Sequence, residues 1–204
     1  MKNNKIDTIV FDLGGVLVDW NPRYVYQSIF KTTEAVEYFL SSVCTNHWNE
    51  LQDAGRSFAD GTKWLTNIFP EYSNEIAAYY GRWVEMLKGQ INETVDILSD
   101  LKFNHSYRLY ALTNWSAESF PVAYKRFEFL HWFEGILVSG AENLKKPDPA
   151  IFHLLLERYS IQSENTIFID DNRLNIEAAR ILGFQTILYI NSTQYREELS
   201  LLLG

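Results

Sequence analysis

Five short runs of the sequence are almost continuously apolar, and they restrict the fold more than any other feature. They span Thr8–Asp12, Arg108–Leu112, Gly135–Ser139, Thr166–Asp170 and Gln185–Ile190. A strand with one covered face alternates apolar and polar residues, whereas a strand of a parallel sheet is buried on both faces and is apolar throughout. We therefore predict a parallel sheet built from these segments.

Longer segments with helical spacing follow these strands. They cover Ala117–Phe129, Pro149–Tyr159, Asn172–Leu182 and Thr193–Leu203. Pro149 suits the first turn of a helix, and Gly183 suits the position just after a helix ends. The alternation of strands and helices predicts an α/β fold with a doubly wound, Rossmann-like parallel sheet.

The chain between the first two of these strands breaks the alternation. Between Val18 and about Gly89 we find no convincing strand, and the spacing indicates helices at Arg23–Phe30, Thr33–Ser42, Ser57–Phe69 and Asn74–Leu87. A helical insertion over the carboxyl ends of the strands, where ligands bind in such sheets, is the simplest account. We expect a catalytic core of residues 1–17 and 90–204 and a helical cap domain of residues 18–89, which excludes water and selects substrate.

The composition argues against several classes of function. The net charge is −8, with 18 basic and 26 acidic residues, so nucleic acid is not an expected partner. Cys44 is the only cysteine, so the chain forms neither an internal disulfide nor a cysteine-based metal cluster. No signal segment and no charge-free apolar run near the roughly 18 residues of a membrane span is found. We expect a soluble cytoplasmic protein without a membrane partner, with a monomer as the default.

Four short motifs at the ends of predicted strands contain the side chains that can take part in catalysis or metal binding. They are Ile9–Val16, which contains Asp12, then Leu112–Ser116, Lys145–Pro149 and Phe168–Asn172. One crevice at the carboxyl edge of the sheet would collect three carboxylates, a hydroxyl, a lysine and glycine-rich backbone. Such oxygen ligands suit Mg²⁺, and the lysine and backbone amides suit phosphate oxygens. A carboxylate nucleophile that forms an acyl-phosphate is a known strategy.

These four motifs, in this order, resemble the haloacid dehalogenase-like hydrolase superfamily, and the resemblance covers the whole chain. Within it, the chain looks most like small sugar-phosphate phosphatases, such as those that act on α-D-glucose 1-phosphate. The resemblance implies a magnesium-dependent phosphomonoesterase that acts on a small phosphorylated metabolite through an aspartyl-phosphate.

The resemblance also implies a role for each residue around the metal. Asp12 would be the nucleophile and a magnesium ligand, and Gly14 would give its backbone carbonyl to the metal. Asp171 would bind the metal directly, with Asp170 beside it as a ligand or through water.

A second group of residues would bind the substrate. Thr113 would bond a phosphate oxygen through its hydroxyl with help from Asn114, and Leu13 and Gly14 would lie beside the phosphate. Lys146 would neutralise the nucleophile and the transferring phosphoryl group, because phosphoryl transfer needs positioning and charge stabilisation above all.

The chain departs from the superfamily pattern at Gly14. Most phosphatases of the superfamily carry an aspartate there, which protonates the leaving group and then activates water. A general acid supplies about 10²–10⁴-fold in rate, or roughly 3–5 kcal/mol of barrier. Three explanations remain open: a slow enzyme, a replacement such as a cap residue or a metal-oriented water, or a leaving group that needs little protonation. The last explanation favours sugar 1-phosphates over sugar 6-phosphates.

Other functions use the same residues differently. A metal-independent haloacid dehalogenase would also use Asp12, but its fourth motif lacks the paired acids seen at Asp170 and Asp171. A mutase would normally want the acid missing at Gly14. A catalytically weak relative that acts as a binding protein would explain that loss, but not the retained Asp12, Lys146 and Asp171.

Several side chains near the motifs have open roles. Lys145 competes with Lys146 for the inward position, and the superfamily pattern selects Lys146. Trp115 either walls the pocket or packs beneath the cap. Asp19 is more typical of a hinge than of a substrate contact. Arg56 follows a turn that can face the site, although an arginine there is usually solvated.

Overall fold

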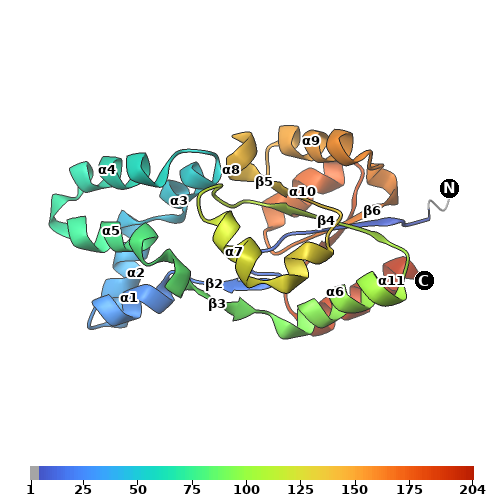
Figure 1. The fold of residues 1–204 in the computed structure, drawn as a ribbon, viewed down its shortest axis with the longest axis horizontal. Helices are drawn as coiled ribbons and strands as arrows, with labels where there is room; N and C mark the ends of the chain where they lie inside the picture. Colours follow the sequence, from blue (N-terminus) through green and yellow to red (C-terminus); the bar gives the residue numbers. More distant parts are fainter. Residues whose placement is uncertain (1–4) are drawn as a thin grey trace.

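The computed structural model describes residues 5–204 and shows the predicted α/β fold (Figure 1). Residues 1–4, which the expected core range includes, lie outside the described part. The central sheet has five parallel strands in the order β5-β4-β1-β6-β7. Its strands are β1 (Thr8–Phe11), β4 (Arg108–Thr113), β5 (Gly135–Val138), β6 (Thr166–Asp170) and β7 (Gln185–Leu188). The predicted parallel sheet is therefore confirmed.

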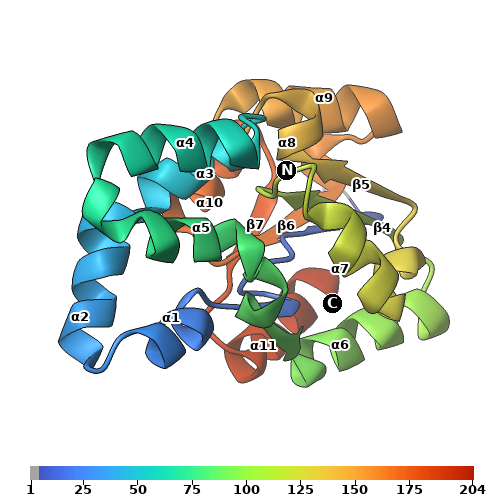
Figure 2. The same ribbon diagram turned by 60° about the vertical axis from the view of Figure 1, so that its left-hand side comes forward.

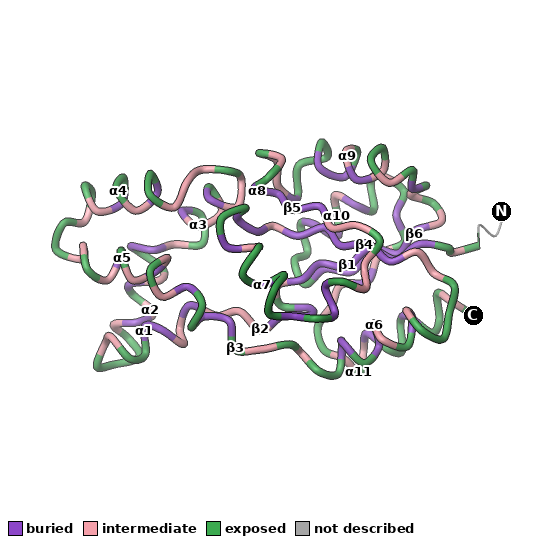
Figure 3. The backbone as a smooth tube through the Cα atoms, in the orientation of Figure 1, coloured by how far each residue is buried: buried purple, intermediate pink, exposed green. Residues whose placement is uncertain are grey.

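Strand β1 occupies the middle of the sheet, and both of its faces are covered. Thr8 pairs with Arg108 on one side and with Thr166 on the other, and all four residues of β1 are buried (Figure 3). Ile9 packs into the larger hydrophobic cluster and Val10 into the smaller one, which lies on the opposite face. This two-sided burial explains the continuous apolar run in the sequence.

Helices cover both faces of the sheet. Helices α6 (Asn92–Asn104) and α11 (Ser192–Leu203) lie together on one face, and α9 (Pro149–Tyr159) and α10 (Arg173–Ile181) lie on the other (Figure 1). Two further helices of the core are α7 (Phe120–Arg126) and the one-turn α8 (Ser139–Glu142), and short 3₁₀ segments cover Glu128–Trp132 and Ser163–Asn165. Pro149 opens α9, and Gly183 follows α10 with φ of +92°, both as predicted.

The helix expected over Ala117–Phe129 is shorter than predicted. It begins at Phe120, where Pro121 stands in the first turn, and it ends at Arg126 before the 3₁₀ segment. Pro121 suits a first turn but not a helix interior, because its ring clashes with the preceding turn and its nitrogen has no hydrogen to donate.

A helical insertion lies between β1 and β4, beside the carboxyl ends of the core strands (Figure 2). Its helices are α1 (Arg23–Ile29), α2 (Thr33–Tyr38) with a π-helical extension (Phe39–Val43), α3 (Asn46–Asp53), α4 (Phe58–Ile68) and α5 (Ser73–Gly81), with 3₁₀ turns at Pro70–Tyr72 and Trp83–Met86. Among residues 5–204, no helix is both long and apolar enough to cross a membrane.

Two short strands tie the insertion to the core. Strand β2 (Val18–Trp20) pairs antiparallel with β3 (Leu87–Gln90), so the expectation of no strand between Val18 and Gly89 was wrong. Neither strand forms an apolar run, because each is very short and contains polar residues such as Asp19 and Lys88. Their pairing depends on a partner far along the chain, which the local pattern does not reveal.

Candidate active site

A buried lysine stands at the centre of the predicted site. Lys146 Nζ lies 2.7 Å from Asp170 Oδ2, 3.0 Å from Asp12 Oδ1 and 2.7 Å from the carbonyl oxygen of Leu112. Asp12 follows β1 directly and Asp170 ends β6, so neighbouring parallel strands deliver the two carboxylates to one sheet edge. Lys146 is only 1% exposed, and it is the inward member of the lysine pair.

Lys145 points the other way. Its Nζ lies 2.6 Å from Glu50 Oε2 on α3, so this lysine joins the core to the insertion. The structure thus separates two adjacent lysines into a buried group beside the carboxylates and a half-buried link to the cap.

The electrostatics of the cluster favour a bound cation. Burial raises the pKa of Asp12, Lys146 opposes that shift, and repulsion from Asp170 and Asp171 adds to it. Burial also disfavours the charged form of Lys146, but Asp12 and Asp170 more than offset this and raise its pKa, so the lysine stays protonated. One ammonium facing three carboxylates leaves an excess of negative charge.

Asp170 is held rigidly by hydrogen bonds. Its Oδ1 accepts from the backbone amide of Asn172 at 2.8 Å and from Asn175 Nδ2 at 2.9 Å, while its Oδ2 accepts from Lys146 and from the same Asn175 nitrogen at 3.0 Å. Asn175 was not predicted from the sequence, although its position on the inward face of α10 could have indicated a polar contact. Asn172 caps this helix, since its side chain accepts a hydrogen bond from the backbone N–H of Leu174.

The three carboxylates can hold one metal ion. One oxygen from each of Asp12, Asp170 and Asp171 lies within 4.8 Å of the others. A set of carboxylate oxygens is the donor set that Mg²⁺ takes, together with waters and phosphate. The backbone passes close by: Gly15 has φ of +76°, and a Cβ added there would lie 2.2 Å from Asp171 Oδ2. Only glycine fits this approach.

The second predicted motif places a hydroxyl and an amide beside the lysine. Thr113 ends β4 and is 1% exposed, and its Oγ1 has no hydrogen-bond partner within the described chain. Buried hydroxyls are normally paired, so this oxygen is available to a ligand. Asn114 uses both ends of its amide on Lys146: Oδ1 accepts from the lysine's backbone N–H at 2.8 Å, and Nδ2 donates to its carbonyl at 2.9 Å.

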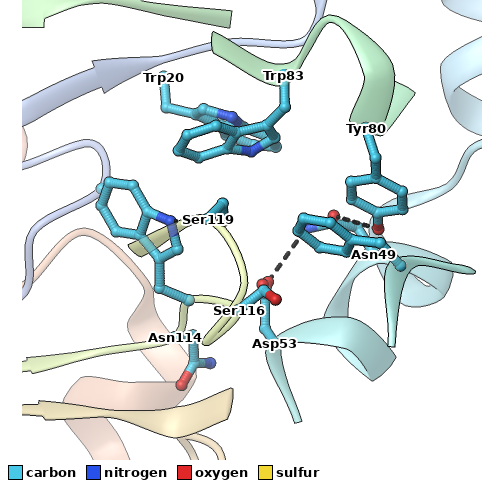
Figure 4. Close-up of a pocket in the computed structure, with 11 residues that line it drawn as sticks. Trp20, Asn49, Asp53, Tyr80, Trp83, Asn114, Ser116 and Ser119 are labelled. Atoms are coloured by element: carbon cyan, nitrogen blue, oxygen red, sulfur yellow. Dashed lines mark hydrogen bonds between the residues drawn. The ribbon is translucent and has the colours of Figure 1, made fainter. Parts of the chain in front are cut away.

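A cavity lies next to the cluster, between the core and the insertion (Figure 4). Trp115 belongs to its wall, and its buried ring also packs edge-on against Trp83 of the insertion, with ring centroids 5.8 Å apart, so both roles considered for it hold. The residues that line the cavity are Gly14, Trp20, Asn49, Asp53, Phe58, Tyr80, Trp83, Asn114, Trp115, Ser116 and Ser119.

Two of the open residues do not reach this cavity. Asp19 accepts a hydrogen bond from the Tyr24 hydroxyl at 2.9 Å, which fits a hinge role. The Arg56 guanidinium bonds Gln52 Oε1 at 2.5 Å and lies over the Trp64 ring, so it packs within the insertion. Asp53, at the start of the same turn, faces the cavity instead; the turn Asp53–Arg56 was expected to face the site, but with Arg56 as its contact residue.

Comparison with known proteins agrees with this geometry. The family model for haloacid dehalogenase-like hydrolases matches residues 6–183 of the sequence. The chain belongs to this family. Two relatives of this haloacid dehalogenase-like hydrolase, and one solved structure with the same fold, match nearly the whole chain.

The sesquiterpene phosphatase of Aspergillus oryzae is 26% identical over 96% of this chain and 95% of its own. The D-ribitol-5-phosphate phosphatase of Bacteroides thetaiotaomicron is 25% identical over 98% of this chain and 99% of its own. A haloacid dehalogenase family enzyme from Bacteroides thetaiotaomicron, solved as a magnesium complex, has a TM-score of 0.68 and 23% identity over 90% of this chain and 93% of its own, which shows the shared fold.

Proposed function

We propose that this haloacid dehalogenase-like hydrolase is a magnesium-dependent phosphomonoesterase that acts on a small phosphorylated metabolite through an aspartyl-phosphate on Asp12. The observation that carries this proposal is the cluster of Asp12, Lys146, Asp170 and Asp171, which leaves a negative excess suited to a cation and a lysine suited to a phosphoryl group. Its relatives from Aspergillus and Bacteroides are phosphatases, which supports the same reading.

In this proposal, Asp12, Asp171 and the backbone carbonyl of Gly14 would hold Mg²⁺. Asp170 acts through water, because both of its oxygens already accept hydrogen bonds from protein groups. The bound ion would neutralise charge on the phosphoryl oxygens. The magnesium complex of the Bacteroides structure supports the choice of metal.

The phosphate is held from the other side of the cluster. The unpaired hydroxyl of Thr113 donates to a phosphate oxygen, and the backbone near Leu13 and Gly14 lies beside it. Lys146 offsets the charge that develops in the transition state. Asn114 contributes by holding the backbone of Lys146 in place, since both ends of its amide are engaged there.

The reaction then proceeds in two displacements. A carboxylate oxygen of Asp12 attacks phosphorus, the bond between phosphorus and the ester oxygen breaks, and the departing oxygen takes a proton from an acid of the site or from water and leaves as the alcohol. Water then attacks the aspartyl-phosphate, releases inorganic phosphate and restores the Asp12 carboxylate.

We propose a sugar phosphate as the substrate, with sugar 1-phosphates favoured. No acid stands at Gly14, and the anomeric oxygen of a 1-phosphate is less basic than an ordinary alcohol oxygen, so it needs less protonation to leave. The D-ribitol-5-phosphate phosphatase of Bacteroides supports a small phosphorylated polyhydroxy metabolite as the substrate, while the preference for 1-phosphates rests on Gly14 alone. The helical insertion, assigned to residues 18–89, is proposed as the cap domain that selects the substrate.

A second substrate class is favoured by the walls of the cavity. Five aromatic side chains line it: Trp20, Phe58, Tyr80, Trp83 and Trp115. Such walls suit the phosphate ester of an apolar alcohol, because burial of apolar surface drives binding. The Aspergillus relative, a sesquiterpene phosphatase, belongs to that class.

One assay tests the function and separates the substrate classes. Purified protein is given sugar 1-phosphates, sugar 6-phosphates and prenyl phosphates, with Mg²⁺ and with EDTA, beside the Asp12→Asn variant. We expect hydrolysis that needs Mg²⁺ and is lost in the variant. Activity that survives EDTA or the Asp12 change would contradict the mechanism. No hydrolysis of any phosphate would favour a binding protein.

A further inference from the structure

Resting on the proposed function, we propose that Asp53 of the insertion supplies the proton that the core cannot supply at Gly14. In this assignment Asp53 protonates the leaving alcohol and then accepts a proton from the attacking water. The catalytic acid thus comes from the cap rather than from the loop after β1.

The first support is position. Asp53 ends α3, and its side chain lines the same cavity as Gly14 and Asn114, which flank the nucleophile and the lysine (Figure 4). Asn49 Nδ2 donates to Asp53 Oδ2 at 3.0 Å and orients the carboxyl group. The alcohol that Asp12 displaces from phosphorus enters this cavity, because Gly14, two residues after Asp12, is part of the cavity wall.

The second support is rigidity. Ser139 Oγ of the core donates to the backbone carbonyl of Asp53 at 2.5 Å. Gly55, two residues on, has φ of +103°, and a Cβ there would lie 2.0 Å from Asn143 Oδ1, so the turn is pressed against the core. The link between Glu50 and Lys145 adds a further tie. A proton donor works best when it is held in place before the reaction.

The third support is protonation state. Burial raises the pKa of Asp53 to about 7, repulsion from Glu50 adds to this, and a backbone hydrogen bond from Ser116 and the charge of Lys145 oppose it. Tyr79 and Tyr80 of α5 also lie near, and burial raises the pKa of both phenols, so they stay neutral. A group with a pKa near the working pH can both donate and accept a proton.

The proton balance closes with this one residue. Asp12 attacks phosphorus, the ester bond breaks, and the Asp53 carboxyl gives its proton to the departing oxygen. The Asp53 carboxylate then takes a proton from water as that water attacks the aspartyl-phosphate. Phosphate leaves, and both aspartates return to their starting forms.

This assignment changes what Gly14 means for the substrate. With an acid in the cap, substrates with poor leaving groups also react. The preference for 1-phosphates then reflects the lower basicity of the anomeric oxygen, which the acid compensates only in part. Without Asp53, the rates for good and poor leaving groups should differ more, so the dependence of the rate on the leaving group tests the assignment.

The test compares Asp53→Asn with wild type on a sugar 6-phosphate and on 4-nitrophenyl phosphate, whose leaving group needs no proton. We expect kcat/KM on the sugar 6-phosphate to fall about 100-fold or more and kcat/KM on the aryl ester to stay within about threefold, because kcat/KM reports the steps up to departure of the leaving group and not the later attack of water. Asp60→Asn, the same change at an exposed cap position, is the control and should leave both rates unchanged.

Adding Gly14→Asp to Asp53→Asn should restore the 6-phosphate rate, because a Cβ at Gly14 meets no atom within 4 Å and φ there is not positive. In wild type, kcat/KM on the 6-phosphate should decline as the pH rises above about 7, where Asp53 loses its proton in the free enzyme. The aryl ester should not show this decline, and this measurement needs no variant.

Equal losses of kcat/KM on the two substrates would show that Asp53 has a structural or binding role, and unchanged kcat/KM values would show that another group gives the proton; either result overturns the inference. Wild type that hydrolyses neither of these esters nor any phosphate of the substrate panel would instead remove the proposed function, and the inference with it. Wild-type activity with the expected selective loss supports both.

Discussion

Replacing Lys146 with methionine tests whether this lysine holds two buried carboxylates together. Its ammonium lies 2.7 Å from Asp170 and 3.0 Å from Asp12, whose side chains are 0% and 11% exposed. With an effective dielectric of about 20, each contact is worth roughly 6 kcal/mol of gross attraction, and desolvation of the charges offsets much of it. Breaking a buried pair leaves an uncompensated charge, so we expect a loss of about 3–5 kcal/mol in the free energy of unfolding.

Urea unfolding at pH 7 with EDTA measures this loss without compensation by a metal. Lys145→Met is the matched control, since its pair with Glu50 is partly exposed and worth about 1 kcal/mol or less. A cycle with Asp170→Asn isolates the coupling, and the double variant should lose less stability than the sum of the single variants, by about 1–3 kcal/mol. A Lys146→Met loss no larger than the control, with no coupling, would refute this reasoning.

Three further changes probe single contacts. Gly15→Ala should lower the free energy of unfolding by about 1–3 kcal/mol and weaken Mg²⁺ binding, because φ at Gly15 is positive and the added Cβ clashes with Asp171. Gly14→Ala is the control: its added Cβ meets open space, so the free energy of unfolding should change by no more than about 0.5 kcal/mol. Urea unfolding and Mg²⁺ titration compare the two variants. Thr113→Val should leave stability nearly unchanged but weaken inhibition by inorganic phosphate about tenfold, a loss of one hydrogen bond to a charged group; equal inhibition would exclude a phosphate contact. Arg56→Ala should lower the melting temperature and leave KM unchanged, because Arg56 packs inside the insertion, and a raised KM would place it at the substrate.

The sheet could be predicted from sequence because its signal is local. A parallel strand buried on both faces is apolar along its whole length, as Thr166–Asp170 shows. Pro149 marked the start of α9 for an equally local reason, since its missing N–H is tolerated in the first turn. The positions of Asp12 and Asp170 followed from the sheet itself, because parallel strands end at one edge.

The parts that escaped prediction depend on contacts between distant segments. The pair of β2 and β3 forms across the whole insertion, and neither strand shows a pattern of its own. The turn Asp53–Arg56 was expected to face the site, but Asp53 and not Arg56 lines the cavity, because Ser139 and Lys145 dock the turn and its helix against the core. The same holds for Trp83, which reaches the cavity from a 3₁₀ turn.

Trapping of the phosphoenzyme tests the central claim most directly. The protein is mixed with Mg²⁺ and a substrate that it turns over, quenched in acid within one turnover, and digested for mass spectrometry. The account predicts one added phosphoryl group on the peptide that carries Asp12, and none in the Asp12→Asn variant. Turnover without any phosphorylated peptide, or a phosphoryl group on another residue, would contradict the account.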